Sequence, residues 1–395
     1  MRLAYLVSDF SIDLDKPGGP SSHIKGSVQG FQSHGYEVKV FLAGDYKLME
    51  PSQSVSKSTN QVKKGANKAK GVRLLISELR RRWNLRKLPE TLVSELKAFE
   101  PDVIYERSSI FSDAGVRLAQ ELKCFHLLET SGCESEIFEE TYGLFSIRFS
   151  NWLEGRKLNL AHAVITQSSA SVIPVVNKFK LKVPAIAKPI GQDIPIRNQL
   201  SKEIVPKQVF ELRKRYSCLV VFVGTFASYQ GPEFLMKIIG SAQIKYPEIG
   251  FILCGEGGNQ LECFEYSKTN NLSNVLFTGM LGSDSLNATL NICDIAIVPD
   301  CERNLSPIKV LQYGANKLPV IVPNYPAFDE LIVQGKTGYR FESGNIDSVL
   351  ACFGLVLDSF ERVAFMGQKF QDVIRNRYSW KMAVSDVVDA ISKKS

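Results

Sequence analysis

Long apolar runs are absent from the sequence. None of its 395 residues lies in an unbroken apolar run of eighteen or more, which is the length that a membrane-spanning helix needs. The start of the chain differs from a signal peptide, because its apolar stretch is about five residues long and ends at Asp9. The eight cysteines form no CxxC pair and no zinc-type spacing with histidine, so we expect reduced, mostly buried thiols and no metal site. These absences favour a cytoplasmic protein.

The composition is that of a folded globular protein, since hydrophobic residues make up 44% and charged residues 23% of the chain. A length of 395 residues is too great for one ordinary core and suits two domains of roughly 150–200 residues each. Short apolar segments alternate with amphipathic ones, which is the pattern of parallel α/β sheets. The sequence therefore predicts two α/β domains.

The expected strands fall into two series. The first comprises 3–7, 36–42, 102–105, 126–129 and 163–166, with a helix at 24–33 and a polar loop at 43–71. The second comprises 219–223, 249–254, 275–278, 295–298 and 320–322, with helices at 232–246, 286–292 and 379–391. Prolines gather at 184–205 without helical periodicity, which predicts a linker there. We expect two Rossmann-like domains facing each other across a cleft: residues 1–195, with a helix at 379–395 crossing back to them, and residues 196–378.

The net charge of +7 is unevenly placed. The segment 57–87, which begins with Lys57 and ends with Lys87, has eleven Lys or Arg residues and one acid, Glu78. One interpretation is a solvated loop and helix face. The other is a site for an anionic membrane surface, because apolar residues recur at helical spacing beside arginines. The apolar residues are Val72, Leu75, Ile76, Leu79 and Trp83, and the arginines are Arg73, Arg80, Arg81 and Arg82. We expect no nucleic-acid partner, because no recognition motif accompanies the charge.

Glycine-containing turns follow two of the expected strands. Gly18 and Gly19 precede a helix expected to start near Ser22, where free amides suit anionic or hydroxylated groups. The third glycine of a dinucleotide fingerprint is missing, so a plain turn is the alternative. The sequence GEGG at 255–258 follows strand 249–254, where a nucleotide can lie against the backbone. A tight structural turn is the alternative there as well.

The segment 298–322 gives the strongest chemical signal. A strand ends at Pro299, and Ser306 and Pro307 then provide an N-cap and a first-turn proline for a helix. The helix dipole and free amides at such a start suit a diphosphate. Lys309 adds a positive charge in the first turn, and Gln312 is placed to reach a sugar hydroxyl.

These motifs together resemble the retaining glycosyltransferases of the GT-B fold, in particular the large family 4. GGPSSH is similar to the family's GGxxxH loop, FQSHGYEVKVF to its GHEV strand, and PDVIYER and AHAVITQSS to segments of its acceptor domain. Motifs similar to those of its donor domain follow in the family's order: VFVGTFASYQG, ILCGEGG, NVLFTGML, CDIAIVPD, SPIKVLQYGANKLPVIV and GKTGYRF. The resemblance covers nearly the whole chain. It implies a donor site on the C-terminal domain and an acceptor site on the N-terminal one.

The resemblance also implies residue roles. The donor would be a UDP- or GDP-linked sugar, with no further cofactor, and no metal is implied because a DxD carboxylate pair is absent. The implied donor-binding residues are Gly224, Thr225, Gln230, Gly255, Glu256, Gly257, Gly279, Met280, Leu281, Asn304, Leu305, Ser306, Pro307, Lys309 and Gln312. The implied acceptor-binding residues are Gly18, Gly19, His23 and Arg107. The implied catalytic residues are Lys309 together with Glu129 and Thr130, which stand where the family often has a histidine.

The sequence departs from the family pattern at the donor site. Thr225 and Gln230 replace an Arg and a Lys that grip the diphosphate, and the family's Glu-x7-Glu pair falls on Asn304 and Gln312. Each charge-assisted contact is worth about 1.5–3 kcal/mol, so the loss of two cations matters. Lys309 and the helix amides offset this in part, which indicates a subfamily with an altered donor site.

Three functions are compatible with these features. The first is a retaining glycosyltransferase that moves a sugar to a glycan or lipid-linked acceptor in cell-surface polysaccharide or glycolipid biosynthesis. Its task would be positioning and charge stabilisation, because the leaving diphosphate acts as the base. The second is a non-catalytic GT-B subunit that stabilises or targets a partner glycosyltransferase, which the missing Arg, Lys and Glu support. The third is a sugar-nucleotide epimerase, which the PDVIYER segment disfavours. We expect a cytoplasmic location, with peripheral attachment to the inner membrane face as a variant.

Overall fold

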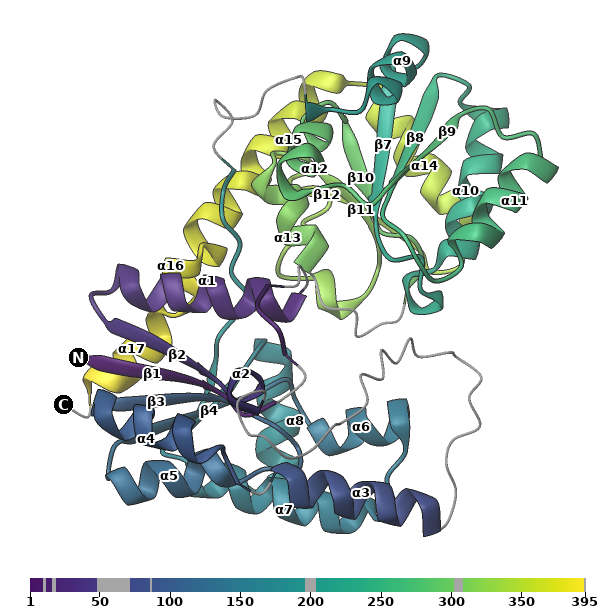
Figure 1. Cartoon of the computed structure of the whole chain (residues 1–395). Helices are drawn as coiled ribbons and strands as arrows, with labels where there is room; N and C mark the ends of the chain where they lie inside the picture. Colours follow the sequence, from purple (N-terminus) through teal and green to yellow (C-terminus); the bar gives the residue numbers. More distant parts are fainter. Residues whose placement is uncertain are drawn as a thin grey trace. The chain divides into compact units, whose positions relative to one another are not determined.

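The computed structural model describes residues 1–9, 12–15, 19–47, 72–85, 87–195, 204–301 and 308–393. The chain divides into two compact units, coloured along the sequence in Figure 1. Unit 1 comprises Met1–Gly191 and Trp380–Ser395, and unit 2 comprises Gln192–Ser379. Each unit has its own parallel sheet and its own core, so the two are described separately.

Unit 1 is built on a six-stranded sheet in the order β2-β1-β3-β4-β5-β6, with every pair of neighbours parallel. The strands are β1 (Arg2–Val7), β2 (Glu37–Leu42), β3 (Val103–Arg107), β4 (Phe125–Thr130), β5 (Ala163–Thr166) and β6 (Ala185–Ala187). From β1 the chain adds β2 on one side of this strand and then β3 to β6 on the other side. The direction therefore reverses between β1 and β3, and in open α/β sheets such a reversal is where ligands bind beyond the carboxyl ends of the strands.

Helices cover both faces of this sheet. They are α1 (Gly19–Ser33), α2 (Ala43–Lys47), α3 (Val72–Leu85), α4 (Glu90–Phe99), α5 (Ala114–Leu122), α6 (Glu134–Tyr142), α7 (Ile147–Leu160), α8 (Ser169–Phe179), α16 (Trp380–Ala383) and α17 (Ser385–Ser392). Alternate residues of β1 face opposite cores, as the two-residue period of a strand requires. Leu3 and Tyr5 pack with α1 and α17, whereas Ala4 and Leu6 pack with α4 and α5.

Unit 2 repeats the architecture with a six-stranded parallel sheet in the order β12-β11-β10-β7-β8-β9. The strands are β7 (Cys218–Val223), β8 (Ile249–Cys254), β9 (Val275–Gly279), β10 (Ile295–Ile297), β11 (Val320–Pro323) and β12 (Gly338–Phe341). The strand order reverses between β7 and β10. The same rule places the ligand edge of unit 2 at the loops that follow these two strands.

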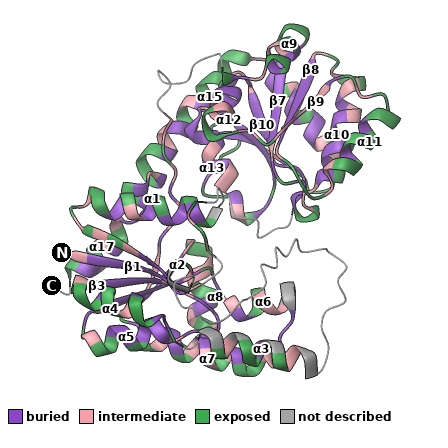
Figure 2. Ribbon diagram, viewed as in Figure 1, coloured by how far each residue is buried: buried purple, intermediate pink, exposed green. Residues whose placement is uncertain are grey.

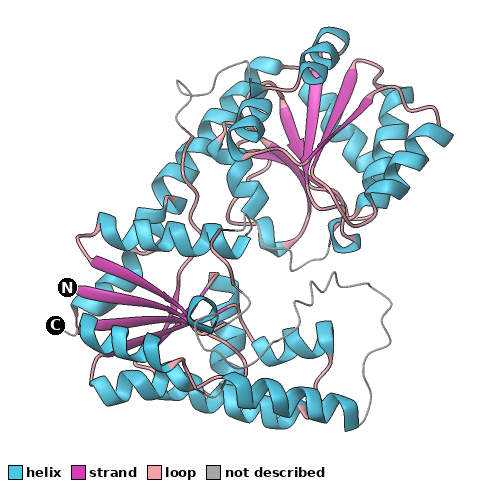
Figure 3. Cartoon of the chain, in the orientation of Figure 1, coloured by secondary structure: helices cyan, strands magenta, loops and turns pink. Residues whose placement is uncertain are grey.

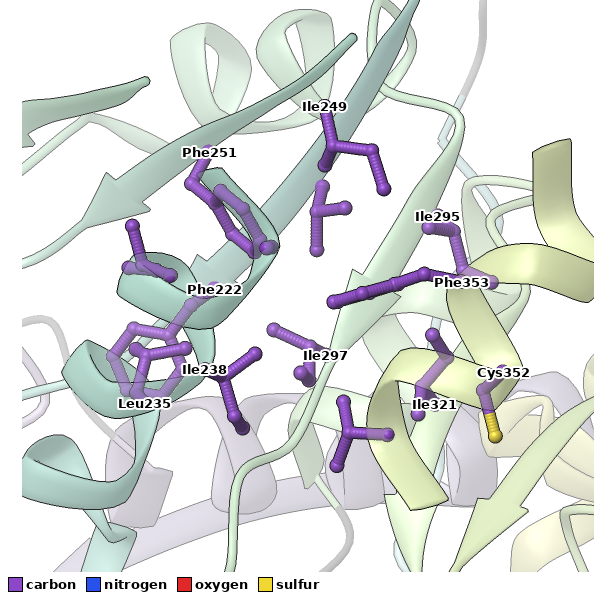
Figure 4. Packing of buried hydrophobic residues seen from close by; sticks show 14 of the residues in the cluster. Phe222, Leu235, Ile238, Ile249, Phe251, Ile295, Ile297, Ile321, Cys352 and Phe353 are labelled. Atoms are coloured by element: carbon purple, nitrogen blue, oxygen red, sulfur yellow. The ribbon is translucent and has the colours of Figure 1, made fainter. Parts of the chain in front are cut away.

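Helices also flank the sheet of unit 2 (Figure 3). They are α9 (Lys207–Arg215), the 3₁₀ turn η3 (Ser228–Gln230), α10 (Pro232–Lys245), α11 (Gln260–Thr269), α12 (Ser283–Leu290), α13 (Ile308–Ala315), the 3₁₀ turn η4 (Pro326–Phe328), α14 (Ile346–Leu357), α15 (Phe360–Val373) and the π-helical turn η5 (Ile374–Tyr378). The core combines aliphatic side chains with aromatic rings, and Phe251 of β8 and Phe353 of α14 meet there edge to face at 5.8 Å (Figure 4). Most strands are buried, as Figure 2 shows, whereas β2, β6 and β9 are only partly buried.

Trp380 anchors the end of the chain in unit 1. A Cβ atom added at Gly26 or Gly191 would lie 1.9 or 2.4 Å from its indole ring, and one added at Gly30 would lie 2.5 Å from its carbonyl oxygen. Glycine is therefore needed at all three positions for the ring and the backbone to approach. The predicted return of the C-terminal helix to the N-terminal domain is confirmed.

The prediction of two Rossmann-like α/β domains is confirmed by the two parallel sheets, while several local predictions are wrong. The segment predicted to be a linker includes β6, which pairs with β5, and the loop predicted from residue 43 begins with α2. The strand β12 was not expected. The helix predicted to start near Ser22 starts at Gly19. No helix among the described residues is long and apolar enough to cross a membrane.

Candidate functional site

The loops after β7 and β8 of unit 2 touch through glycines. The N–H of Gly224 donates to the carbonyl of Cys254 at 2.9 Å, and the N–H of Gly255 donates to the carbonyl of Gly279 at 2.8 Å. Gly255 has φ +125°, and a Cβ there would lie 1.8 Å from the carbonyl oxygen of Gly224. Only glycine meets both conditions. The three strand ends thus form a tight edge of backbone groups.

Thr225 and Gln230, the two residues that replace the family's cations, are bonded to each other. Gln230 Oε1 accepts from the backbone N–H of Thr225 at 2.9 Å, and Gln230 is buried. A Cβ at Gly231 would lie 2.0 Å from the carbonyl oxygen of Asp300, so this loop also packs closely against the segment after β10. The Gln230 side chain therefore stabilises the loop from within and gives the ligand edge no positive charge.

Glu256 holds the loop that follows β9. Its Oε1 accepts a hydrogen bond from the backbone N–H of Met280 at 3.1 Å. Gly279, which precedes Met280, has φ +72°. The Met280 side chain is exposed and Leu281 is half-buried. Gly257, with φ +100°, lies in the turn after β8. These residues offer an edge of backbone groups and one carboxylate.

Lys309 lies in the first turn of α13 and is half-buried. Its Nζ lies 5.5 Å from the centre of the Phe222 ring, and with Gln230 and Pro299 it lines a small cavity. Burial lowers the pKa of the Lys309 ammonium to about 8, an effect that Cys301 opposes only in part. Lys309 forms no ion pair with any carboxylate in the part of the chain that the structure describes. A buried cation in this state is stabilised by an anionic ligand.

Gln312, one turn further along α13, is half-buried. Its backbone carbonyl accepts from the backbone N–H of Asn316 at 3.2 Å and from the side-chain Nδ2 of the same residue at 2.9 Å. The predicted donor residues Asn304, Leu305, Ser306 and Pro307 lie outside the described residues, as does the predicted acceptor residue Gly18.

Another cavity of unit 2 lies away from Lys309. It has a volume of about 690 Å³ and is lined by residues that include Tyr325, Arg340 and Ser343. None of the predicted donor-binding residues that the structure describes lines it. The hydroxyl of Ser343 donates to the carboxylate of Asp300 at 2.9 Å, and the hydroxyl of Tyr325 donates to the same carboxylate. These bonds tie the cavity wall to the segment after β10.

In unit 1 the predicted residues His23 and Glu129 form a buried pair. Nε2 of His23, on α1, lies 2.6 Å from Oε1 of Glu129 at the end of β4. The hydroxyl of Tyr105 donates to Oε2 at 2.5 Å, and the side-chain amide of Gln167 donates to Oε1 at 3.0 Å. Lys188, directly after β6, places its Nζ 3.9 Å from Oε2. Glu129 is 1% exposed, so its carboxylate is surrounded by donors from this protein.

The charge states of this group follow from its surroundings. Burial alone would raise the pKa of the Glu129 carboxyl, but His23, Lys188 and Arg107 hold it well below its usual range. Burial lowers the pKa of the His23 imidazole; Glu129 opposes the change, and Lys188 and Arg107 add to it. Burial next to Glu129 raises the pKa of the Tyr105 hydroxyl. The group at neutral pH is therefore an ionised carboxylate beside a neutral imidazole.

The other residues predicted for unit 1 lie at the same edge of its sheet. Arg107 ends β3, and its Nη1 is buried without a hydrogen-bond partner among the described residues. Thr130 ends β4, and its hydroxyl donates to the carbonyl of Gly132 at 2.7 Å, which commits it to the following turn. Gly19 is the first residue of α1. A ligand that accepts a hydrogen bond from Nη1 of Arg107 would satisfy this buried donor.

Sequence reasoning missed three members of this group: Tyr105, Gln167 and Lys188. Tyr105 and Gln167 stand inside the quoted motifs PDVIYER and AHAVITQSS, and Gln167 directly follows a predicted strand. A polar residue directly after a parallel strand was therefore an available signal. Lys188 gave no such signal, because β6 was not predicted. In the described part of the chain, no cluster of His, Cys, Asp or Glu is arranged to hold a metal ion.

The segment predicted to bind an anionic surface is described from residue 72 to 85 and at 87. Its only acid, Glu78, is buried, where it accepts from Arg82 at 2.6 Å and from the backbone N–H of Phe145 at 2.8 Å. Leu79 is 55% and Trp83 is 75% exposed. The outer face of α3 is thus apolar and basic without an acid.

Comparison with known proteins adds a sequence match in unit 2. Residues 207–368 match the family described as "Glycosyl transferases group 1". A phosphatidyl-myo-inositol mannosyltransferase of Propionibacterium freudenreichii subsp. shermanii is 25% identical over 205 residues. That match spans 51% of this chain and 49% of the relative, so about half the length of each protein is compared.

Solved structures resemble the chain over its whole length. HepE of Anabaena, crystallised in complex with UDP, gives a TM-score of 0.69 at 15% identity and covers 100% of both chains. Sucrose-phosphate synthase of Thermosynechococcus elongatus gives a TM-score of 0.65 at 14% identity, covering 100% of this chain and 99% of the other. At these identities the likeness establishes the fold.

Proposed function

We propose that this chain, whose fold resembles GT-B structures and whose residues 207–368 match the group 1 glycosyltransferases, transfers a sugar from a nucleotide-sugar donor to an acceptor hydroxyl. The observation that carries the proposal is Lys309. Its half-buried ammonium is unpaired with any described carboxylate. It lies at the ligand edge of unit 2, where a donor diphosphate would neutralise it. HepE is known in complex with UDP, which supports a UDP-linked donor, with GDP as the alternative base.

In the proposed reaction unit 2 holds the donor and unit 1 the acceptor. The bond between the anomeric carbon and the diphosphate oxygen breaks, and a bond from the same carbon to the acceptor oxygen forms on the same face of the sugar. The acceptor proton passes to the leaving diphosphate. Lys309 stabilises the negative charge that develops there, and the glycine-rich loops after β7 and β8 present backbone groups to the nucleotide. The residues of the chain thus act by positioning and charge stabilisation.

We further propose a glycan or lipid-linked acceptor, in the biosynthesis of a cell-surface polysaccharide or glycolipid. The relative that acts on phosphatidyl-myo-inositol supports a lipid-linked acceptor. The acid-free outer face of α3, with Trp83 and Leu79 exposed, supports attachment to an anionic leaflet. His23 and Arg107, at the carboxyl edge of the sheet of unit 1, are the proposed acceptor contacts, with Glu129 beside them and Thr130 at the end of β4.

A non-catalytic subunit is the second candidate. The hydrogen bond between Gln230 and Thr225 favours it, because the two positions that carry cations in the resembling family are occupied here by residues committed to each other. Such a protein would keep the fold and bind a partner glycosyltransferase without turning over a nucleotide-sugar.

A donor panel separates the two candidates. UDP- and GDP-sugars are added to the full chain, and thermal unfolding and donor hydrolysis are both measured. A ligand that binds only the folded state raises the unfolding temperature, by an amount that grows with its concentration. The enzyme proposal predicts stabilisation and slow hydrolysis with at least one donor, both lost in Lys309→Ala and kept in the exposed control Lys237→Ala. Absence of both effects with every donor would favour the subunit.

A further inference from the structure

Lys188 is a fully buried ammonium in unit 1 that none of the resemblances assigns. Its Nζ donates to Oγ of Ser27 at 3.1 Å and lies 3.2 Å from Nε2 of His23 and 3.9 Å from Oε2 of Glu129. The ring of Trp380 lies 5.9 Å away. A cation at this depth is costly unless its charge is compensated, and Glu129 is the carboxylate that compensates it.

The proton of His23 is placed by Glu129. An ionised carboxylate only accepts hydrogen bonds, so the 2.6 Å contact requires a proton on Nε2 of His23. In the neutral imidazole, Nδ1 then carries a lone pair and no proton. That nitrogen can accept a hydrogen bond from a hydroxyl group.

The charges around His23 come from every element packed against it. The charged groups are Glu129 from β4, Arg107 from β3 and Lys188 after β6. Tyr105 of β3 and Tyr5 of β1, which lie beside Glu129, are neutral, and α16 contributes the uncharged Trp380. Two cations thus face one carboxylate. A third positive charge, on His23, is disfavoured by Arg107 and Lys188.

We propose that Lys188 is a positioning residue of the acceptor site: its ammonium keeps Glu129 ionised and His23 neutral, so that Nδ1 of His23 accepts a hydrogen bond from the acceptor hydroxyl. The catalytic part rests on the proposed function, with unit 1 as the acceptor site. The electrostatic part stands on the contacts alone. Removal of the ammonium leaves Glu129 as the dominant neighbour of His23, and the imidazole then takes a second proton at higher pH.

The electrostatic part is tested by NMR titration of His23 in the full chain, with the signal assigned by His23→Gln. The pKa of His23 rises by about one unit or more in Lys188→Met, as expected when a charge within about 4–6 Å is removed, and it stays low in Lys188→Arg. Lys157→Met is the matched control, because Lys157 is equally buried but donates to Oγ of Ser108 and the carbonyl of Ser109. An equal shift in Lys188→Met and Lys157→Met, or none in Lys188→Met, overturns the proposal.

The catalytic part is tested by the pH profile of kcat/KM for the acceptor. In Lys188→Met the acidic limb moves to higher pH by the same amount as the NMR titration, and the acceptor KM rises while the donor KM is unchanged. Lys188→Arg restores the profile. An active protein whose profile does not move overturns the role of Lys188. A wild-type protein with no transferase activity overturns the proposed function instead, while the titration still decides whether Lys188 sets the charge of His23.

Discussion

Oε1 of Gln230 accepts a hydrogen bond from the backbone N–H of Thr225 at 2.9 Å, across the turn that follows β7. A Cβ at Gly224 would lie 2.6 Å from the same oxygen, so the side chain fills the inside of the turn. The loop is therefore held by a neutral amide at a position where the resembling family has a cation. At this edge Gln230 therefore maintains the shape of the loop, and Lys309 supplies the positive charge.

Replacing Gln230 by Met removes the acceptor while keeping most of the side-chain volume. The N–H of Thr225 then loses its partner, and we expect the free energy of unfolding to fall by about 1–3 kcal/mol. Amide hydrogen exchange at Thr225 should become faster in the same variant. Unchanged exchange at this amide would show that the Gln230 bond does not hold the turn.

Replacing Lys309 by Ala should weaken nucleotide-sugar binding by about 1.5–3 kcal/mol, roughly tenfold or more, because a charge-assisted contact to the diphosphate is lost. Gln312→Ala should cost about 1 kcal/mol, since a neutral hydrogen bond to a hydroxyl is weaker. Calorimetric titration of both variants with the same donor compares them. Equal and negligible effects would argue against a donor on α13.

Nucleotide binding should weaken as the pH rises through about 8, the pKa to which burial lowers the Lys309 ammonium. Below that pH the free protein carries the cation that the diphosphate needs, and above it the neutral amine must first take up a proton. The affinity for UDP, measured by calorimetry between pH 6.5 and 9.5 (a range of about 1.5 units on either side), should fall only on the alkaline side. Lys309→Arg should flatten this dependence, because a guanidinium keeps its proton.

Trp83→Ser should weaken binding to anionic vesicles without changing the unfolding temperature, because the side chain is 75% exposed on the outer face of α3. Binding of the wild-type chain should decrease as salt is added, since the attraction is screened over about 8–10 Å. Ile244→Ser, at an exposed apolar position of unit 2, is the control and should have no effect. Equal binding to neutral and anionic vesicles would contradict an electrostatic surface.

The strands with strong local patterns were predictable. The bounds predicted for β5 and β8 agree with the structure, because runs of β-branched and apolar residues are bounded there by turn residues. The three residues of β6 were hidden by the prolines on either side, Pro184 and Pro189, which favour the reading of a linker. The pairing of β6 with β5 is a tertiary effect that no local pattern reports.

The GT-B fold that the resemblance implied is confirmed, and residues 207–368 match the group 1 glycosyltransferases. The assignment to family 4 and the retaining mechanism stay predictions. The sequence motifs identified Glu129 and His23 as candidate site residues, but they could not predict which side chains surround Glu129. His23 and Lys188 lie 165 residues apart in sequence, yet Nε2 of His23 is 3.2 Å from Nζ of Lys188 in the structure. Only the order of the strands brings the ends of β4 and β6 to one edge.

The packing of Trp380 against Gly26, Gly30 and Gly191 has a consequence for folding during synthesis. Unit 2 is one continuous stretch of chain, whereas the core of unit 1 also needs Val384, Val387 and Ile391, which follow unit 2. A ribosome therefore finishes every residue of unit 2 before it supplies the last ones of unit 1. The half of the molecule that is made first completes its core last, and until then the face of α1 that carries Gly26 and Gly30 lacks Trp380.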